Sequence, residues 1–182
     1  MNPYLVLLRG INVGGRNKIP MKALRQELED LGYQQVSTYI ASGNVLLNSP
    51  GPPEQLGEDI EAVLVEKFDL DDELVKVLVL TPEQLRGIVD HKPEAFGEQP
   101  DKYHSDAIFL MGIDAETAMT AFRPREGVDV VWPGNGVIYS QRLSAERTRS
   151  RLGAIVASPL YKSMTIRSWS TTMNLWDRFP LH

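Results

Sequence analysis

The sequence of 182 residues contains no cysteine and only three histidines. The lack of cysteine excludes disulfide bonds, thiolate nucleophiles, zinc–thiolate sites and iron–sulfur clusters. His91, His104 and His182 are scattered along the chain, so they do not indicate a metal site. Long apolar runs are also missing, because Arg9 interrupts the first one, Tyr4–Leu8, far short of a signal sequence or a membrane span. We therefore expect a cytoplasmic protein that uses no metal or cofactor and enters no membrane.

Charge is distributed very unevenly along the chain. Residues 1–26 carry five basic and no acidic side chains, and residues 142–167 carry six basic and one acidic. Residues 27–141 carry 22 acids and 7 bases, so the whole chain has a net charge of −5. Two basic segments on an acidic background favour a local anion site that repels nonspecific polyanions. The alternative is an uneven surface charge without function.

The apolar pattern predicts the element order β-α-β-β-α-β twice. The predicted strands cover residues 4–9, 36–40, 45–47, 74–80, 107–111, 128–132, 137–140 and 164–168. Thr81-Pro-Glu-Gln84 has the pattern of a capping box that opens a linking helix, and Asp114 is a predicted helix cap. A later helix is predicted to carry Leu152, Ile155 and Val156 on one side, and a last helix Met173, Trp176 and Phe179.

This order predicts an α+β fold made of two tandem ferredoxin-like subdomains. The first covers residues 1–80, a linking helix and loop cover 81–104, and the second covers 105–182 with an extra C-terminal helix. Each half is near the lower size limit for independent stability, so we expect the halves to pack together. A single mixed sheet with another strand order is the alternative.

Two sequence blocks carry a family resemblance. Leu-Arg-Gly-Ile-Asn-Val-Gly-Gly-Arg-Asn-Lys at 8–18 and Thr-Tyr-Ile-Ala-Ser-Gly-Asn-Val at 38–45 resemble the bacterial family catalogued as domain of unknown function 1697. Residues 149–152 and 165–171 resemble its C-terminal blocks. The resemblance implies two ferredoxin-like subdomains and no established activity, cofactor or catalytic residue. Ser168 and Ser170 stand where that block commonly has asparagines, so a ligand held by those amides would be held differently in this chain.

The glycine-rich segment Gly10–Lys18 is the first candidate site. Glycine-rich turns let several backbone N–H groups point at one anion, and nearby cations add charge. The spacing Gly10-x-x-x-x-Gly15-Arg16-Asn17 superficially matches a nucleotide-binding P-loop. It lacks the lysine and the hydroxyl residue that such a loop requires, so a P-loop NTPase is excluded. An anion-binding loop and a tight structural turn remain the two interpretations.

The second candidate is Arg147-x-Arg149-x-Arg151 together with Arg167 beside Trp169. The three alternating arginines cannot share one face of an α-helix, but in a loop their guanidinium groups can hold phosphate or carboxylate. Salt bridges to the acidic middle of the chain are the alternative role.

Other chemistries have little support in the sequence. The strand aromatics do not form an RNA-binding block, so nucleic acid is an unfavoured partner. Ser42 lacks a nucleophile elbow. His104 and Asp106 suit a base with an orienting carboxylate if they lie on one strand, but a loop position before a strand is the commoner arrangement.

We therefore expect a non-enzymatic binder of a small phosphorylated, carboxylated or nucleotide-like ligand, with a basic site between the two halves. The expected ligand-binding residues are Arg9, Asn12, Gly14, Gly15, Lys18, Ser42, Asn44, Arg149, Arg151, Arg167 and Trp169. One alternative is an enzyme acting on a phosphorylated substrate, with these groups as electrostatic stabilisers. Another is a homo-oligomer or adaptor with an exposed apolar interface formed by Trp132, Tyr139, Trp169 and Trp176.

Overall fold

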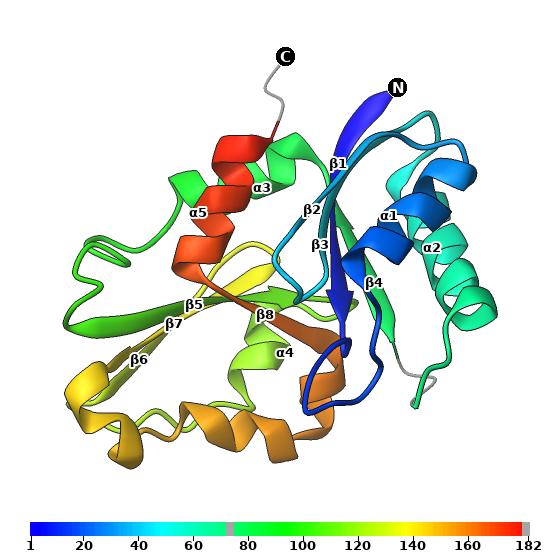
Figure 1. Ribbon diagram of the computed structural model, residues 1–182. Coiled ribbons are helices and arrows are strands. Elements are labelled where there is room, and N and C mark those ends of the chain that lie inside the picture. The colour runs from blue at the N-terminus through cyan, green and yellow to red at the C-terminus, as the bar shows by residue number, and fades with distance from the viewer. Residues whose placement is uncertain (72–74, 180–182) are drawn as a thin grey trace. The chain divides into compact units, whose positions relative to one another are not determined.

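A computed structural model describes residues 1–71 and 75–179. The chain divides into two units, the first formed by Met1–Leu85 with residues 177–179 and the second by Arg86–Trp176. Across the described residues each unit contains a four-stranded antiparallel sheet, and helices pack on it (Figure 1). An α+β fold is therefore confirmed. Leu74, the predicted start of the fourth strand, lies outside the described residues, as does His182.

In the first unit the strand order is β2-β3-β1-β4. Its elements are β1 (Asn2–Arg9), α1 (Met21–Asp30), β2 (Gln34–Tyr39), β3 (Asn44–Ser49), α2 (Pro53–Lys67) and β4 (Lys76–Leu80). Helices α1 and α2 lie on one face of the sheet (Figure 1). β4 is the last strand on its side of the sheet, because its only neighbour among the described strands is β1.

The core of the first unit follows from two periodicities. Alternate residues of β1, among them Val6 and Leu8, point to the face that the helices cover. Leu24 and Leu28 of α1 lie one turn apart, and the buried positions of α2 are Leu56, Ile60, Val63 and Leu64. Full burial of one such side chain contributes about 1.5–3 kcal/mol. These clusters match the apolar stripes expected from the sequence.

The ends of the helices also follow the predicted local signals. Gly32 has φ +92° just after α1, and its N–H donates to the carbonyl oxygen of Glu29. Helix α3 (Pro82–Asp90) opens with the predicted capping box, because Thr81 and Gln84 exchange hydrogen bonds between side chain and backbone at 2.9 and 3.2 Å.

The second unit has the strand order β6-β7-β5-β8. Its elements are β5 (Tyr103–Leu110), α4 (Ala115–Met119), β6 (Asp129–Pro133), β7 (Val137–Leu143), the 3₁₀ helices η1 (Ser144–Arg149), η2 (Leu152–Ala157) and η3 (Pro159–Ser163), β8 (Met164–Ser168) and α5 (Trp169–Arg178). α4, η2 and η3 supply apolar side chains to the core on one face of this sheet. Asp114 caps α4 as predicted, since its side chain accepts from the Thr117 N–H.

The single helix predicted around Leu152, Ile155 and Val156 is wrong. Three short 3₁₀ helices occupy this segment, and Val156 is 61% exposed. The reason lies in the breaks between them. Ser150 and Arg151 are hydrogen-bonded to Asp129, and Ser158 ends η2 and caps η3 just before a proline.

Two further boundaries differ from prediction. β5 begins at Tyr103 rather than at 107, which places His104 and Asp106 within the strand. The stripe predicted for the last helix is right for Phe179, which is buried just after α5, but wrong for Met173 and Trp176, which are half-buried. α5 itself buries Trp169, Thr172 and Leu175. Among the described residues, no helix combines the length and apolarity needed to span a bilayer.

The hairpin between β2 and β3 generates a stability prediction. Gly43 has φ +87°, and a Cβ there would lie 2.8 Å from Leu8 Cβ and 2.9 Å from Ile11 Cδ1. Gly43→Ala combines an unfavourable left-handed backbone with overpacking, so we expect a loss of about 2–4 kcal/mol in the free energy of unfolding. Gly32→Ala is the matched control: it has a similar φ but nothing within 4 Å, and we expect a loss of about 1 kcal/mol. Urea denaturation measures both, and equal losses would contradict the packing argument.

Candidate functional site

The segment Gly10–Ile19, named here the glycine loop, leaves β1 and returns to α1. Its closure depends on Asn12, which has φ +54°. The Asn12 amide donates to the carbonyl oxygen of Ile19 at 2.9 Å and accepts from the Ile19 N–H at 2.8 Å. The same Nδ2 donates to the carbonyl oxygen of Ala41 at 2.7 Å, in the β2–β3 hairpin. The side chain of Asn12 therefore acts as an extra peptide group that joins the two ends of the loop to the hairpin.

A second amide holds the loop from the inside. Asn17 is buried, with φ +47°, and its Nδ2 donates to the carbonyl oxygen of Gly10 at 2.8 Å. The Asn17 N–H donates to an oxygen of the Asp71 carboxylate at 2.7 Å, and its carbonyl oxygen accepts from the Asn12 N–H at 3.0 Å. These hydrogen bonds hold the loop in one conformation, although it contains no regular secondary structure.

The tip of the glycine loop is a tight turn from Val13 to Arg16. The Arg16 N–H donates to the carbonyl oxygen of Val13 at 3.0 Å, and the central residues Gly14 and Gly15 have φ +60° and +73°. Positive φ at both central positions is the type I′ geometry, which glycine adopts most easily. In the described part of the chain, the Gly14 and Gly15 N–H groups make no hydrogen bond.

Two exposed cations flank this turn. Arg16 and Lys18 form no ion pair with any described residue. Among the described acids, Asp71 is linked to the loop by a hydrogen bond, which it accepts from the Asn17 N–H. The tip therefore presents two unused backbone donors and two cations on a fixed frame.

Other expected ligand residues of the first unit have structural contacts. Asn44 is fully buried, and its Nδ2 donates to the carbonyl oxygen of Tyr39 and to Ser42 Oγ, both at 2.9 Å. These bonds close the β2–β3 hairpin. Arg9 is the last residue of β1, half-buried and opposite Lys76 in the register of β4.

The arginines of η1 and its flank are on the surface of the second unit. Arg149 forms an ion pair of 3.2 Å with Glu146 and is 58% exposed, so this pair contributes little to stability. The Arg151 N–H donates to Asp129, whereas the exposed side chains of Arg147 and Arg151 make no ion pair within the described residues.

Arg167 and Trp169 are buried, each 7% exposed. Arg167 Nη1 donates to Thr165 Oγ1 and to the carbonyl oxygen of Ile166, both at 2.9 Å, and burial lowers the pKa of Arg167 to about 10. It therefore remains a cation at neutral pH. Trp169 packs edge-on against Phe96, with ring centroids 5.1 Å apart.

The prediction of an exposed aromatic interface for an adaptor is wrong, because Tyr139 and Trp169 are buried. Tyr139 is buried, with its hydroxyl donating to the carbonyl oxygen of Ile88 at 2.6 Å, and it packs on Phe96. Trp132 also contacts Phe96, and Trp176 is half-buried beneath the Arg86 guanidinium. These rings form packing within the second unit.

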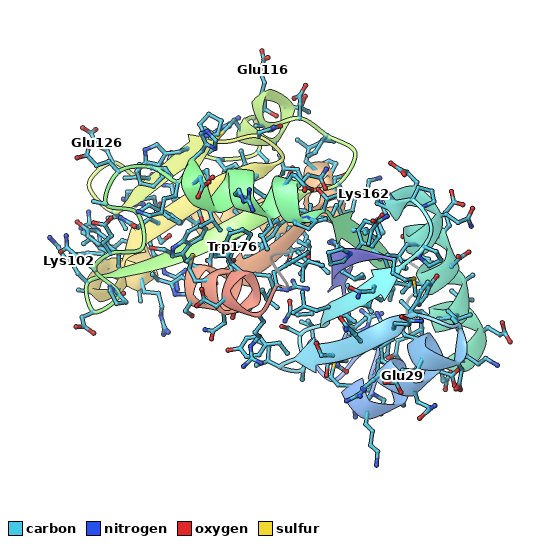
Figure 2. The ribbon with its side chains drawn as sticks, turned by 90° about the horizontal axis from the view of Figure 1, so that it is seen from above. Glu29, Lys102, Glu116, Glu126, Lys162 and Trp176 are labelled. Atoms are coloured by element: carbon cyan, nitrogen blue, oxygen red, sulfur yellow. The ribbon has the colours of Figure 1, made fainter. Side chains whose placement is uncertain are left out.

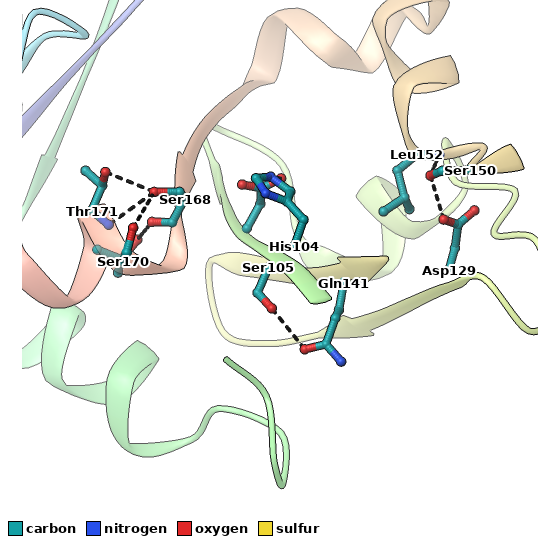
Figure 3. Close-up of polar contacts among 11 residues, drawn as sticks. His104, Ser105, Asp129, Gln141, Ser150, Leu152, Ser168, Ser170 and Thr171 are labelled. Carbon is teal, nitrogen blue, oxygen red and sulfur yellow. Dashed lines mark hydrogen bonds and ion pairs between the residues drawn. The ribbon is translucent and has the colours of Figure 1, made fainter. Parts of the chain in front are cut away.

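Ser168 has a local role at the start of α5. Its Oγ accepts from the Thr171 N–H at 3.1 Å and lies 3.2 Å from Ser170 Oγ (Figure 3). This is the geometry of an N-cap, in which serine and asparagine are nearly equivalent.

His104 and Asp106 share one face of β5, with Nε2 3.0 Å from an Asp106 carboxylate oxygen. Burial raises the pKa of Asp106, and His104 and Arg142 oppose that rise. Ser105 points to the other face, where its hydroxyl donates to Gln141 (Figure 3). Ser105, which lies between them in the sequence, therefore does not face the His104–Asp106 pair. Among the described residues, no three His, Cys, Asp or Glu side chains are grouped to hold a metal ion.

Asp129 is a buried carboxylate that sequence reasoning did not select. It accepts from Ser150 Oγ at 2.6 Å (Figure 3), from the Arg151 N–H at 2.8 Å and from the Arg125 N–H at 2.9 Å. Burial opposes ionisation, but these hydrogen bonds and the nearby Arg142 charge outweigh it and hold the pKa of Asp129 below its usual value. Asp129 thereby fixes the segment that carries Arg149 and Arg151.

Arg16 was also missing from the expected site residues. The Gly14-Gly15-Arg16 sequence contains the signal, since a two-glycine turn places the next residue beside its own N–H groups. The structure brings Gly14, Gly15, Arg16 and Lys18 together at one tip, whereas Asn12 and Asn44 hold backbone groups instead.

The regions of this chain that match known proteins include strands of both sheets. A family model described as "Protein of unknown function (DUF1697)" matches residues 1–139. The solved structure of the conserved bacterial protein SP0830 from Streptococcus pneumoniae is similar, with 26% sequence identity and a TM-score of 0.80, over 96% of this chain and 97% of that one. No curated protein matches the chain.

The depressed pKa of Asp129 predicts a pH-dependent contribution to stability. The stabilisation is complete above the unfolded-state pKa of about 4 and is lost as the pH falls through the lower folded-state value. Asp129→Asn leaves one amide oxygen for three donors, so whichever way the amide faces, either the two N–H groups or Ser150 lose an acceptor. We expect the free energy of unfolding to fall by about 1–3 kcal/mol at pH 7, and this loss to narrow below pH 4. Urea denaturation at pH 7 and pH 3 measures this. Asp114→Asn is the control, because asparagine caps a helix as well as aspartate does; a loss for Asp129→Asn as small as the control's would contradict the role.

Proposed function

This chain belongs to the DUF1697 family of proteins of unknown function, and we propose that it binds a small phosphorylated or nucleotide-like anion at the tip of its glycine loop. The observation that carries the proposal is the pair of unused N–H groups at Gly14 and Gly15, flanked by the exposed cations Arg16 and Lys18. Converging backbone N–H groups with an adjacent cation are a common solution for holding phosphate.

Rigidity supports this function. Asn12 and Asn17 hold the loop by at least five hydrogen bonds of 2.7–2.9 Å, which involve their side chains and the Asn17 N–H. A fixed loop does not lose further conformational freedom when the ligand binds, so more of the interaction energy appears as affinity. The amides thus act as the frame, and the glycines and cations act as the contact.

We infer binding rather than catalysis. Residues 10–19 contain no histidine or acid, and the linked Asp71 carboxylate accepts the Asn17 N–H. The roles of Arg149, Arg151 and Arg167 as ligand contacts, and a cytoplasmic location, remain predictions from the sequence.

We also propose that the two units are ferredoxin-like and arose by duplication. In its own order of appearance, each sheet runs second-third-first-fourth with antiparallel neighbours. The second unit departs from the pattern between β7 and β8, where three 3₁₀ helices replace an α-helix.

The test is a titration with inorganic pyrophosphate and a nucleoside triphosphate, followed by amide NMR at low and moderate salt. We expect the Gly14 and Gly15 N–H signals to shift, and the Kd to rise with salt as charges are screened. Arg16→Ala and Lys18→Ala should each raise the Kd about tenfold, since hydrogen bonds to charged groups contribute about 1.5–3 kcal/mol. Lys102→Ala, a surface change of equal charge on the second unit (Figure 2), should leave the Kd within twofold.

A variant that is expected to increase the affinity tests the same site. Asp71→Asn keeps an oxygen that accepts from the Asn17 N–H but removes the negative charge next to the loop. We expect it to lower the Kd several-fold at low salt. Absence of any Gly14 or Gly15 shift, or shifts confined to other residues, would refute the proposed site.

A further inference from the structure

A groove lies along the outer side of β4, on the first unit. It has a volume of about 270 Å³ and lies between α2, the edge of β4 and the start of α3. Its lining residues are Pro53, Glu54, Gly57, Glu58, Glu61, Val77, Val79 and Gln84. None of the residues of the glycine loop contributes to it, so it is a separate feature.

The floor of the groove is an open strand edge. The Leu8 N–H donates to Gly43 on the β3 side of the sheet, so alternation directs the polar groups of Leu7 toward β4 and those of Leu8 away from it. Because Leu8 lies opposite Val77 and Val6 opposite Val79, the N–H and C=O groups of both valines point outward. The Val77 N–H confirms this, since it donates to Glu61 Oε1 at 2.9 Å.

Val79 is the part of this edge that remains open. Within the described residues, neither its N–H nor its C=O has a hydrogen-bond partner, and the Val77 C=O has none either. Exposed strand edges are commonly blunted by charges or by covering segments. Here one carboxylate blocks one donor, and three main-chain groups are left available for pairing.

The wall of the groove is acidic. Glu54, Glu58 and Glu61 lie at successive turns on one side of α2, next to the apolar stripe that packs on the sheet. No lysine or arginine lines the groove. Gly57 lies between these carboxylates and adds no side chain, although glycine within a helix costs about 1 kcal/mol relative to alanine. A Cβ there would contact Val79 at 3.7 Å, so glycine keeps this wall bare.

We propose that this groove docks an extended basic segment of a partner protein, which adds as an antiparallel strand to β4. A residue opposite Val79 exchanges two main-chain hydrogen bonds with it, and another N–H donates to the Val77 carbonyl oxygen. Lysine or arginine side chains on alternate positions face Glu54, Glu58 and Glu61. The same carboxylates repel nucleic acid and anionic membranes, which makes a basic peptide the chemically matched occupant.

The experiment uses the full chain and three acetylated, amidated peptides. Lys-Val-Lys-Val-Lys-Val-Lys has the required charge and strand propensity; Lys-Pro-Lys-Pro-Lys-Pro-Lys keeps the charge but lacks the alternate N–H groups; Glu-Val-Glu-Val-Glu-Val-Glu reverses the charge. We expect the first to bind and to slow hydrogen exchange of the Val79 amide at least tenfold. The second should bind at least tenfold more weakly, and the third should not bind.

Charge-reversal variants locate the site. Glu54→Lys combined with Glu58→Lys should weaken binding of the first peptide at least tenfold, while Glu126→Lys, on the surface of the second unit (Figure 2), should change it less than twofold. Urea denaturation checks that the variants remain folded. Equal binding of the valine and proline peptides, or an unchanged Val79 exchange rate, would overturn strand addition. Equal effects of the two charge reversals would overturn this location. Neither outcome bears on the glycine loop, which is tested by different probes and residues.

Discussion

The amide of Asn12 is the interaction on which the architecture of the candidate site depends. It pairs with both the N–H and the C=O of Ile19, as a neighbouring strand would, and it also donates to the carbonyl oxygen of Ala41 in the β2–β3 hairpin. A ten-residue connection without regular secondary structure would otherwise leave buried backbone groups unpaired, which costs about 1–3 kcal/mol each. By pairing these groups at the base, Asn12 and Asn17 allow the Gly14 and Gly15 N–H groups at the tip to remain unbonded within the described residues.

Throughout the described part of the chain, the hydrogen bonds that polar groups already make separate structural features from candidate functional ones. Asp129, Asn44 and Ser168 have polar side chains that could bind a ligand, yet each is already hydrogen-bonded to neighbouring groups. The groups that stay open, the Gly14 and Gly15 N–H and the edge of Val79, belong to residues with no reactive side chain. In this protein the available chemistry is therefore mostly main-chain, with charge supplied by a few cations on one surface and a few carboxylates on another.

Local signals in the sequence were reliable where one segment decides its own structure. The strand at 164–168, the Thr81 capping box and the Asp114 cap all occur as predicted. Predictions failed where a residue far away in the sequence determines the local structure. The helix expected through Leu152 is broken because Asp129, on another strand, holds Ser150 and Arg151 in non-helical geometry. Trp169 appeared available beside Arg167, but Phe96 and Tyr139 come from elsewhere in the chain to cover it.

The sequence by itself determined the α+β class, the family membership and the succession of strands, because periodicity, caps and turn residues act over a few positions. It also identified the glycine loop, since two successive glycines specify a turn with positive φ. Only the tertiary structure decided which donors in that loop remain unused, which arginines are buried, and that β4 has an open edge beside an acidic helix face. These properties depend on contacts between residues far apart in the sequence, such as Asn17 with Asp71, 54 positions apart, and Val77 with Glu61, 16 positions apart. Such pairings leave no local signature.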